Sequence, residues 1–388
     1  MDFVLSPDQQ IAADLCLNSI KQGQETILTG AAGTGKTTLM KYIIANSGRK
    51  VVIGCPTGKA ALRAKEVTKT PAATIHRLLY GGVDSTSSSN EPLFSLPKAP
   101  CADKDLLIVD EASMLGKKLY EELMHWKPNK APVLFVGDKE QLEPVKDTWG
   151  PDLDNPTAAL TQVHRQAEGS QIISFATAIR QKKGEKWLAD WKEADENTVH
   201  IRAGLDEALF WYLKNRQENK DSILLTYTHA VRTEINDTIR AVLNYNEPLC
   251  PGDRILIRVN SGRTGLMNGE IVTVKKAERQ RTKTWWKVHL EERKEPIWVN
   301  EELIEKSVGE YWKWYGTLTP KMKVFPWIHV WRGDCITVHS SQGSSWQEVG
   351  FIWDDAFRRA QKMKKDFARR FLYTGVTRAE EQVNLFSI

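Results

Sequence analysis

The sequence predicts an α/β protein that has two parallel-sheet lobes and two insertions. Short β-branched runs alternate with helical patterns in both halves of the chain, as is typical of βαβ units. One short stretch is crowded with glycine, serine and proline, which indicates a hairpin or loop. A later window has alternating runs joined by turns, which indicate a small inserted β-barrel.

The first lobe is assigned to residues 1–80 and 101–165. Its apolar runs of four residues have the length and composition of buried strands. They lie at 26–29, 51–54, 106–109 and 133–136. Because helical patterns separate these runs, we expect the strands to be parallel.

The second lobe is assigned to residues 166–250 and 332–388, where similar apolar runs recur. These lie at 223–226, 336–338, 349–352 and 383–386. Residues 251–331 interrupt this lobe, and half of the fourteen tryptophans fall between 285 and 331, as expected for an inserted barrel. Residues 81–100 are too short for a domain and suit an exposed hairpin or loop.

Composition indicates a soluble protein of the cytoplasm without membrane attachment. The 388 residues are 41% hydrophobic, and no apolar run approaches the ~18 residues of a membrane span. The N-terminus lacks the basic and apolar regions of a signal peptide. The five cysteines are odd in number and widely spread, which argues against disulfides and a zinc site. Collagen-like, disordered and membrane-spanning classes are excluded.

The basic residues are concentrated in two places. The net charge is only +5, but residues 251–331 hold fifteen Lys/Arg against ten Asp/Glu, a local 15 − 10 = +5. Residues 357–370 hold seven basic residues against one acidic residue, a local 7 − 1 = +6. The apolar spacing of this second run is typical of an amphipathic helix, so its basic face is either solvated or a nucleic-acid contact.

A phosphate-binding loop is predicted between the first strand and a helical run at 39–45. Its residues fit G-x-x-x-x-G-K-[ST] and are Gly30, Ala31, Ala32, Gly33, Thr34, Gly35, Lys36 and Thr37, followed by Thr38. Small residues let backbone N–H groups close around phosphate at the helix N-terminus. Lys36 can reach the β- and γ-phosphates, and the Thr37 hydroxyl can bind Mg²⁺. The alternative is a glycine-rich turn with an accidental lysine, which the flanking strand and helix disfavour.

Two carboxylates follow the buried strand at 106–109. Asp110 is expected to hold Mg²⁺ through its water shell, and Glu111 to act as general base toward the attacking water. A simple kinase does not need such a base, so the pair favours ATP hydrolysis. The alternative is that the two residues only cap a helix.

Taken together, the motifs resemble those of superfamily 1B DNA helicases of the RecD/Dda-like, phage-type branch. The matching segments occur in family order at 5–9, 56–61, 74–79, 110–113, 137–145, 162–166, 337–345 and 372–379. The resemblance implies two RecA-like lobes with ATP between them. It also implies a strand-separating pin at 81–100 and a Src-homology-3-like barrel at 251–331.

The resemblance assigns further residues to the nucleotide. Gln9 would read adenine, with Gln10 less favoured, and Gln141 would link the γ-phosphate to a nearby loop. Gly343 lies in a further nucleotide-binding motif. Arg165 and Arg378 would be arginine fingers that stabilise charge on the γ-phosphate only when the cleft closes. The alternative for each is an ordinary surface arginine.

The resemblance also places single-stranded DNA across both lobes. Its contacts would be Pro56, Thr57, Lys59, Thr74, His76 and Arg77 on the first lobe, and Thr337, His339 and Ser340 on the second. Hydroxyls and few cations suit phosphate contacts that must be released in each cycle. The two histidines could equally be structural. Phe94 in the pin has two interpretations, stacking on a base or anchoring the hairpin.

The sequence therefore predicts a monomeric ATP-dependent 5′-to-3′ single-stranded DNA translocase and helicase. The resemblance alone gives the polarity, and it suggests the cytoplasm of a bacterium or a phage-infected cell. The expected partners are single-stranded DNA and junctions of single- and double-stranded DNA, with contact to a replisome or single-strand-binding protein as a further implication. The alternatives are a superfamily 1 RNA helicase, a P-loop ATPase that does not unwind, and a binding scaffold with an idle ATPase.

Overall fold

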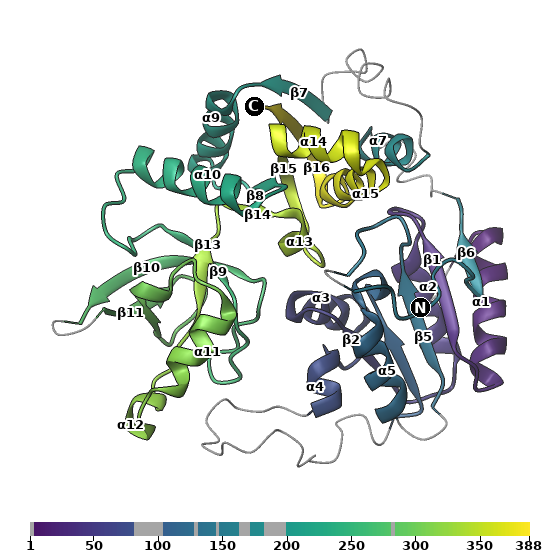
Figure 1. Cartoon of the computed structure of the whole chain (residues 1–388). Coiled ribbons are helices and arrows are strands. Elements are labelled where there is room, and N and C mark those ends of the chain that lie inside the picture. The colour runs from purple at the N-terminus through teal and green to yellow at the C-terminus, as the bar shows by residue number, and fades with distance from the viewer. Residues whose placement is uncertain are drawn as a thin grey trace.

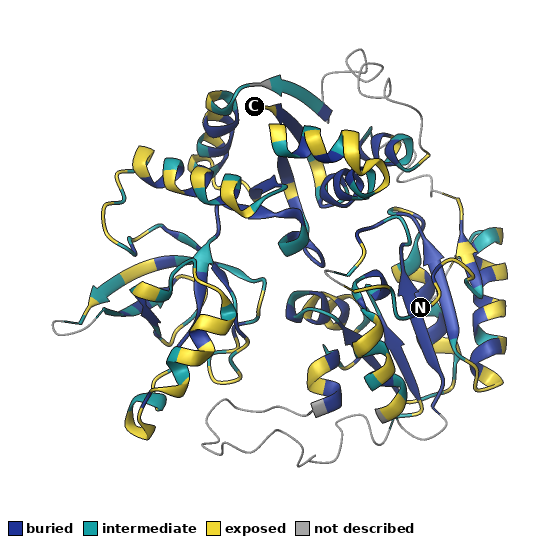
Figure 2. Ribbon diagram, in the orientation of Figure 1, coloured by how far each residue is buried: buried dark blue, intermediate teal, exposed yellow. Residues whose placement is uncertain are grey.

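The structure is a computed structural model that describes residues 4–80, 104–127, 131–144, 147–162, 171–181, 199–280 and 284–388. In these ranges the chain forms two α/β lobes and a separate β-rich region beside the second lobe (Figure 1). Buried strands fill the middle of each lobe, and the exposed residues lie mainly on the outer helices (Figure 2). The predicted pin at 81–100, including Phe94, lies outside the described residues.

The first lobe is built on a parallel sheet of order β3-β2-β4-β5-β1-β6. Its strands are β1 (Thr26–Gly30), β2 (Val51–Cys55), β3 (Ala72–Thr74), β4 (Leu106–Val109), β5 (Val133–Gly137) and β6 (Ala158–Leu160). Every residue of β1, β2, β4 and β5 is buried, because helices cover both faces of the sheet. The helices are α1 (Pro7–Lys21), α2 (Lys36–Asn46), α3 (Gly58–Thr68), α4 (Ile75–Tyr80), the short η1 (Ala112–Met114) and α5 (Lys117–Trp126).

The second lobe is built on a parallel sheet of order β14-β8-β15-β16-β7. Its strands are β7 (Val199–Ala203), β8 (Ser222–Thr226), β14 (Cys335–Thr337), β15 (Trp346–Trp353) and β16 (Ala379–Ser387). Its helices are α7 (Gln171–Arg180), α9 (Leu205–Gln217), α10 (His229–Val242), α13 (Val338–Ser341), α14 (Asp355–Met363) and α15 (Lys365–Val376). The prediction of two parallel-sheet lobes is thereby confirmed.

The basic run at 357–370 forms two helices, where its spacing predicted one. Helix α14 ends at Met363 and α15 begins at Lys365. Lys364 between them has φ −134° and ψ 61°, outside the helical region. Phe371 of α15 is buried in the core of the lobe.

The inserted region is an antiparallel sheet of order β12-β11-β10-β9-β13. Its elements are β9 (Arg254–Ile257), β10 (Ile271–Arg279), β11 (Trp285–Leu290), β12 (Ile297–Asn300), η3 (Glu301–Leu303), α11 (Val308–Gly316), α12 (Pro320–Lys323) and β13 (Val330–Arg332). The Trp298 N–H donates to the Pro326 carbonyl at 2.9 Å, and the Ile328 N–H donates to the Trp298 carbonyl at 2.8 Å. These bonds bring the two edges of the sheet together around its own core. Its likeness to a Src-homology-3 barrel stays a prediction.

Among the described residues, no helix combines the length and the apolar character needed to cross a membrane. The boundaries assigned to the domains also stay predictions. The strands of the first sheet nonetheless all lie before residue 161, and those of the antiparallel sheet lie between 254 and 332.

Candidate nucleotide cleft and nucleic-acid groove

A cleft of about 500 Å³ lies between the two lobes. The first lobe lines it with residues from the phosphate loop, α3 and the ends of β4 and β5. The second lobe lines it with residues from α7, the loop before β15 and the turn after α15. Neither lobe could form this cleft alone.

The phosphate loop connects β1 to α2 with the backbone that its glycines predict. Gly33 and Gly35 have φ values of 78° and 84°, in the left-handed region that glycine adopts without steric cost. Lys36 Nζ donates to the carbonyls of Gly30 at 2.6 Å and Ala31 at 2.9 Å. Lys36, Thr37 and Ala32 line the cleft. The lysine is therefore held across the loop, where an arriving phosphate would meet it.

The two predicted carboxylates also line the cleft, at the carboxyl end of β4. Desolvation, and then the charge of Glu111, raise the pKa of Asp110 to about 6. Glu111 has φ 53°, a strained backbone conformation for a residue other than glycine. The Thr37 hydroxyl and the Asp110 carboxylate are hard oxygen donors in one cleft, as a nucleotide-bound Mg²⁺ requires.

The glutamines predicted to contact nucleotide lie beside the cleft. Gln9 is buried, and its Nε2 donates to the Thr34 carbonyl at 3.4 Å, so it lies against the phosphate loop. Gln10 instead bonds to Asp14 at the surface. Gln141 is buried and lines the cleft, and no group among the described residues bonds to its Oε1. An unpartnered buried acceptor of this kind suits a ligand contact.

Arg378 and Gly343 reach the cleft from the second lobe. The Arg378 guanidinium is buried and donates to the carbonyls of Thr374 at 3.1 Å and Ser344 at 3.3 Å. Burial lowers the pKa of Arg378, while the charge of Glu111 acts in the opposite direction. Arg165, the second predicted finger, lies outside the described residues.

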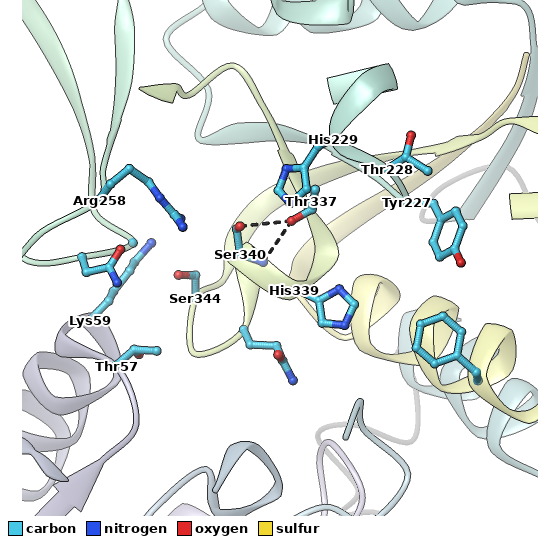
Figure 3. A pocket seen from close by; sticks show the side chains of 14 residues that line it. Thr57, Lys59, Tyr227, Thr228, His229, Arg258, Thr337, His339, Ser340 and Ser344 are labelled. Carbon is cyan, nitrogen blue, oxygen red and sulfur yellow. Dashed lines mark hydrogen bonds between the residues drawn. The ribbon is translucent and has the colours of Figure 1, made fainter. Parts of the chain in front are cut away.

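A second hollow, a groove of about 640 Å³, also runs between the lobes and reaches the inserted sheet. Three of its threonines cap helices whose N-termini therefore point toward it (Figure 3). Thr57 caps α3, Thr228 caps α10 and Thr337 caps α13, each accepting a backbone N–H at 3.2–3.3 Å. Hydroxyls and helix N-termini favour an anion such as phosphate.

The cations of the groove are held on tryptophan rings. Lys59 Nζ lies 4.7 Å from the Trp346 ring, and the Arg258 guanidinium lies 4.0 Å from the Trp331 ring. Arg232 stacks on Trp331 as well, at 4.6 Å. Burial lowers the pKa of both Lys59 and Arg258, in agreement with their partly desolvated positions. Cation–π contacts thus fix two positive charges at the groove without neutralising them.

The side of the groove opposite these cations is aromatic. Figure 3 shows Tyr227 and His339 on the far side from Lys59 and Arg258. The His339 ring stacks on Phe367 at a centroid distance of 6.3 Å, and Tyr227 meets Phe367 edge-on at 6.2 Å. Burial, and then the charge of His229, lower the pKa of His339. The groove therefore has cations on one side and aromatic rings on the other.

The structure brings together some of the predicted contacts and not others. Of the predicted nucleic-acid residues, it places Thr57, Lys59, Thr337, His339 and Ser340 in the groove. The remaining described ones, which do not line it, are Pro56, Thr74, His76 and Arg77. Thr74 pairs with Cys55 in the sheet and so shares the strand edge that leads to Thr57. None of these four residues lines the groove.

Several residues that line the groove were given no role in the sequence analysis. These are Tyr227, Thr228, His229, Arg258, Asn268, Gly269, Gln342, Ser344 and Phe367. The first three directly follow β8, and ligands of open parallel sheets bind at the carboxyl ends of strands. That rule was a usable signal for residues 227–229. No sequence pattern around Arg258, which comes from the inserted sheet, indicates that it lines the groove.

Two family models match the chain. The model described as an AAA domain matches residues 4–202, and the model described as a UvrD-like helicase C-terminal domain matches residues 333–386. The ATP-dependent RecD2 DNA helicase of Deinococcus radiodurans is 30% identical over 374 residues, which cover 92% of this chain and 46% of that protein. The chain therefore spans about half the length of that relative. The ATP-dependent DNA helicase Dda of Enterobacteria phage T4 is 24% identical, with 98% of both chains covered.

The fold is also similar to solved Pif1 helicase structures. Bacteroides Pif1 in complex with ADP-AlF3 and single-stranded DNA has a TM-score of 0.60 at 18% identity, covering 99% of this chain and 92% of that one. A structure of two coordinating Pif1 helicases at forked double-stranded DNA has a TM-score of 0.60 at 19% identity, covering 98% and 92%. Motifs and family models agree, and the chain belongs to the superfamily 1B helicases of the RecD and Dda type.

Proposed function

We propose that this chain is an ATP-dependent DNA helicase that translocates 5′ to 3′ on single-stranded DNA. The cleft would bind ATP with Mg²⁺, and the groove would bind the strand. The observation that carries the proposal is that both hollows lie between the same two lobes and share Ser344 in their walls. A movement of the lobes that changes one hollow must therefore change the other.

The residues of the cleft supply the groups that ATP hydrolysis needs. Lys36 would bind the β- and γ-phosphates, and Thr37 and Asp110 would hold Mg²⁺, which neutralises phosphate charge. Glu111 would accept a proton from the attacking water. Arg378, with Arg165 as the second finger, would stabilise the charge that develops on the γ-phosphate.

The surrounding residues would bind the rest of the nucleotide and respond to it. Gln9 would contact the adenine, and the loop N–H groups at 30–38 would contact phosphate. Gln141 would sense the γ-phosphate through its Oε1, which has no partner among the described residues, and Gly343 would let the second lobe approach. These assignments make hydrolysis depend on lobe closure.

The two walls of the groove suit a single strand without sequence readout. Phosphates would lie against Thr57, Lys59, Thr337, Ser340 and Arg258, and bases against the rings of Tyr227, His339 and Phe367. Pro56, Thr74, His76 and Arg77 would extend the track along the first lobe. Phe94 would stack at the junction, and the inserted barrel would guide the strand.

The deciding experiment is unwinding of matched duplexes that carry one 5′ or one 3′ single-stranded overhang, made of DNA and of RNA, with ATP and Mg²⁺. We expect unwinding of the DNA duplex with the 5′ overhang and none without ATP. Unwinding from the 3′ overhang alone would refute the polarity, and preference for RNA duplexes would favour an RNA helicase. ATPase activity that strands do not stimulate would favour a P-loop ATPase that does not unwind.

The remaining parts of the proposal rest on the resemblance. We propose a monomer in the cytoplasm of a bacterial or phage-infected cell that acts at junctions of single- and double-stranded DNA, with contact to a replisome or single-strand-binding protein. Sedimentation with and without a forked duplex would test the monomer. A second copy on each fork would contradict it.

A further inference from the structure

Helix α15 touches both the nucleotide side and the groove side of the lobe interface. On one side it presents Arg369, Arg370, Tyr373 and Thr374 to the first lobe, a spacing that places them on neighbouring turns. On the adjacent side Phe371 meets the His339 ring at 5.6 Å, and Phe367 stacks on it. Because His339 and Phe367 line the groove, one short helix spans the distance between the two sites.

The first of these sides holds the whole loop at 138–142 that follows β5. Each residue of that loop has a contact to α15. The contacts are Tyr373 Oη to Asp138 Oδ2 at 2.5 Å, Arg370 to the Lys139 carbonyl, Arg369 to the Glu140 carboxylate at 2.7 Å, Arg370 to the Gln141 carbonyl at 3.4 Å, and the Leu142 N–H to Thr374 Oγ1 at 3.0 Å. The loop carries Gln141, which lines the cleft and whose Oε1 has no hydrogen-bond partner in the part of the chain that the structure describes. Contacts from the second lobe thus help to hold the loop that carries Gln141.

Tyr373 also bonds to the phosphate loop, a contact that no other described residue of α15 makes. Its hydroxyl accepts the N–H of Ala32 at 3.1 Å while donating to Asp138. Ala32 belongs to the phosphate loop and lines the cleft. Tyr373 is only 1% exposed, and burial, followed by the charge of Asp138, raises its pKa well above the ordinary value, so it stays a hydrogen-bond donor. One hydroxyl therefore joins the loops after β1 and β5 to the second lobe.

We propose that Tyr373 is a positioning residue that couples the phosphate loop to the nucleic-acid groove through α15. The inference rests on the proposed function and adds how the two sites communicate. Any rearrangement of the phosphate loop around a nucleotide moves the Ala32 N–H, and with it the hydrogen bond that this group donates to the Tyr373 hydroxyl. Because α15 is packed against His339, a shift at Tyr373 moves the aromatic wall of the groove.

A purely structural role for Tyr373 makes a different prediction, and the chain offers a matched control. Tyr212 is also fully buried, donates its hydroxyl to Asp334 at 2.7 Å and accepts from Arg254 at 2.8 Å. It lies in α9 and lines neither hollow. Tyr212→Phe therefore removes the same kind of hydroxyl without touching the path between the sites.

The experiment measures the dissociation constant of a labelled single-stranded oligonucleotide with and without a non-hydrolysable ATP analogue and Mg²⁺. The ratio of the two constants is the coupling between the sites, which typically amounts to about 5- to 150-fold. We expect Tyr373→Phe to bring that ratio to within about twofold of one, and Tyr212→Phe to keep the wild-type ratio. Thr374→Val, which removes the acceptor of the Leu142 N–H, should also lower the ratio.

Thermal unfolding of all variants shows whether a lower ratio results from lost stability, since both tyrosine variants lose a buried hydroxyl. A wild-type ratio in Tyr373→Phe, or an equal loss in Tyr212→Phe, overturns the inference. A ratio of one in the wild-type protein also overturns it, because no coupling then exists. Failure of the wild-type protein to bind any single strand instead overturns the proposed function, and the inference with it.

Discussion

Gly343→Ala tests whether the two lobes must approach as closely as they do here. Gly343 has φ +74°, and a Cβ at this position would lie 2.8 Å from Thr57 Oγ1 and 3.1 Å from Ala60 Cβ. Ordinary contacts begin at 3.4 Å, so Thr57 Oγ1 would have to move by 3.4 − 2.8 = 0.6 Å and Ala60 by 3.4 − 3.1 = 0.3 Å. Thr57 lines the groove and Ala60 lines the nucleotide cleft. One methyl group therefore pushes on both sites at once.

The expected effect of Gly343→Ala comes from two free-energy costs, and a control variant can separate them. The left-handed backbone costs an alanine roughly 1 kcal/mol, and overpacking costs roughly 1–3 kcal/mol. Gly48→Ala has the first cost alone, because Gly48 has φ +64° and no atom of the described residues lies within 4 Å of its added Cβ. The difference of about 2 kcal/mol falls on the closed arrangement of the lobes and corresponds to about thirtyfold in rate.

The assay is strand-stimulated ATPase activity at saturating oligonucleotide, together with thermal unfolding of both variants. We expect similar losses of stability, and an ATPase rate about thirtyfold lower in Gly343→Ala than in Gly48→Ala. Rates within twofold of each other would refute the reasoning, because the lobes would then hydrolyse ATP without this contact.

Three further predictions follow from the same structure. Lys36→Ala should abolish ATP hydrolysis while oligonucleotide binding without nucleotide is retained, and unchanged hydrolysis would show that the phosphate site is misassigned. Arg258→Ala should weaken the binding of normal and abasic strands alike, and should flatten the salt dependence of binding by about 0.7 in the log–log slope. Phe367→Ala should weaken the binding only of strands that carry bases. An equal loss of affinity for abasic strands would contradict base stacking. Burial lowers the pKa of His329 from 6.5 to about 4, so its neutral form stabilises the fold at pH values above 6.5 and that stability is lost as pH falls toward 4. His329→Gln should flatten the fall in melting temperature over this window, and an unchanged slope would exclude His329 as its source.

The central strands were predictable because their signal is local. β1, β2, β4 and β5 are continuous apolar runs, and burial on both faces selects such runs in a parallel sheet. The three-residue edge strand β3 consists of half-buried residues and carries no such run. The break between α14 and α15 was missed for a related reason. A one-residue interruption at Lys364 leaves the apolar spacing nearly unchanged.

The predictable part of the site was likewise the local part. The phosphate loop and the pair at 110–111 are set by neighbours in sequence, and both lie in the cleft. The bond from Ala32 to Tyr373 instead joins residues 341 positions apart, and that from Tyr373 to Asp138 spans 235. Such contacts depend on how the lobes pack. No pattern within a window of the sequence indicates which hydroxyl will meet which loop.

The groove also explains why a net charge of +5 is a poor guide to a polyanionic partner. Its described lysine and arginine, Lys59 and Arg258, lie among capping threonines and aromatic rings. Lys59 belongs to α3 of the first lobe, but the ring beneath it, Trp346, begins β15 of the second. Its position therefore depends on how the lobes are arranged. A phosphate held between Lys59 and the second lobe would be gripped in one arrangement and released in another, and a charge placed in this way serves a moving strand better than many fixed ones.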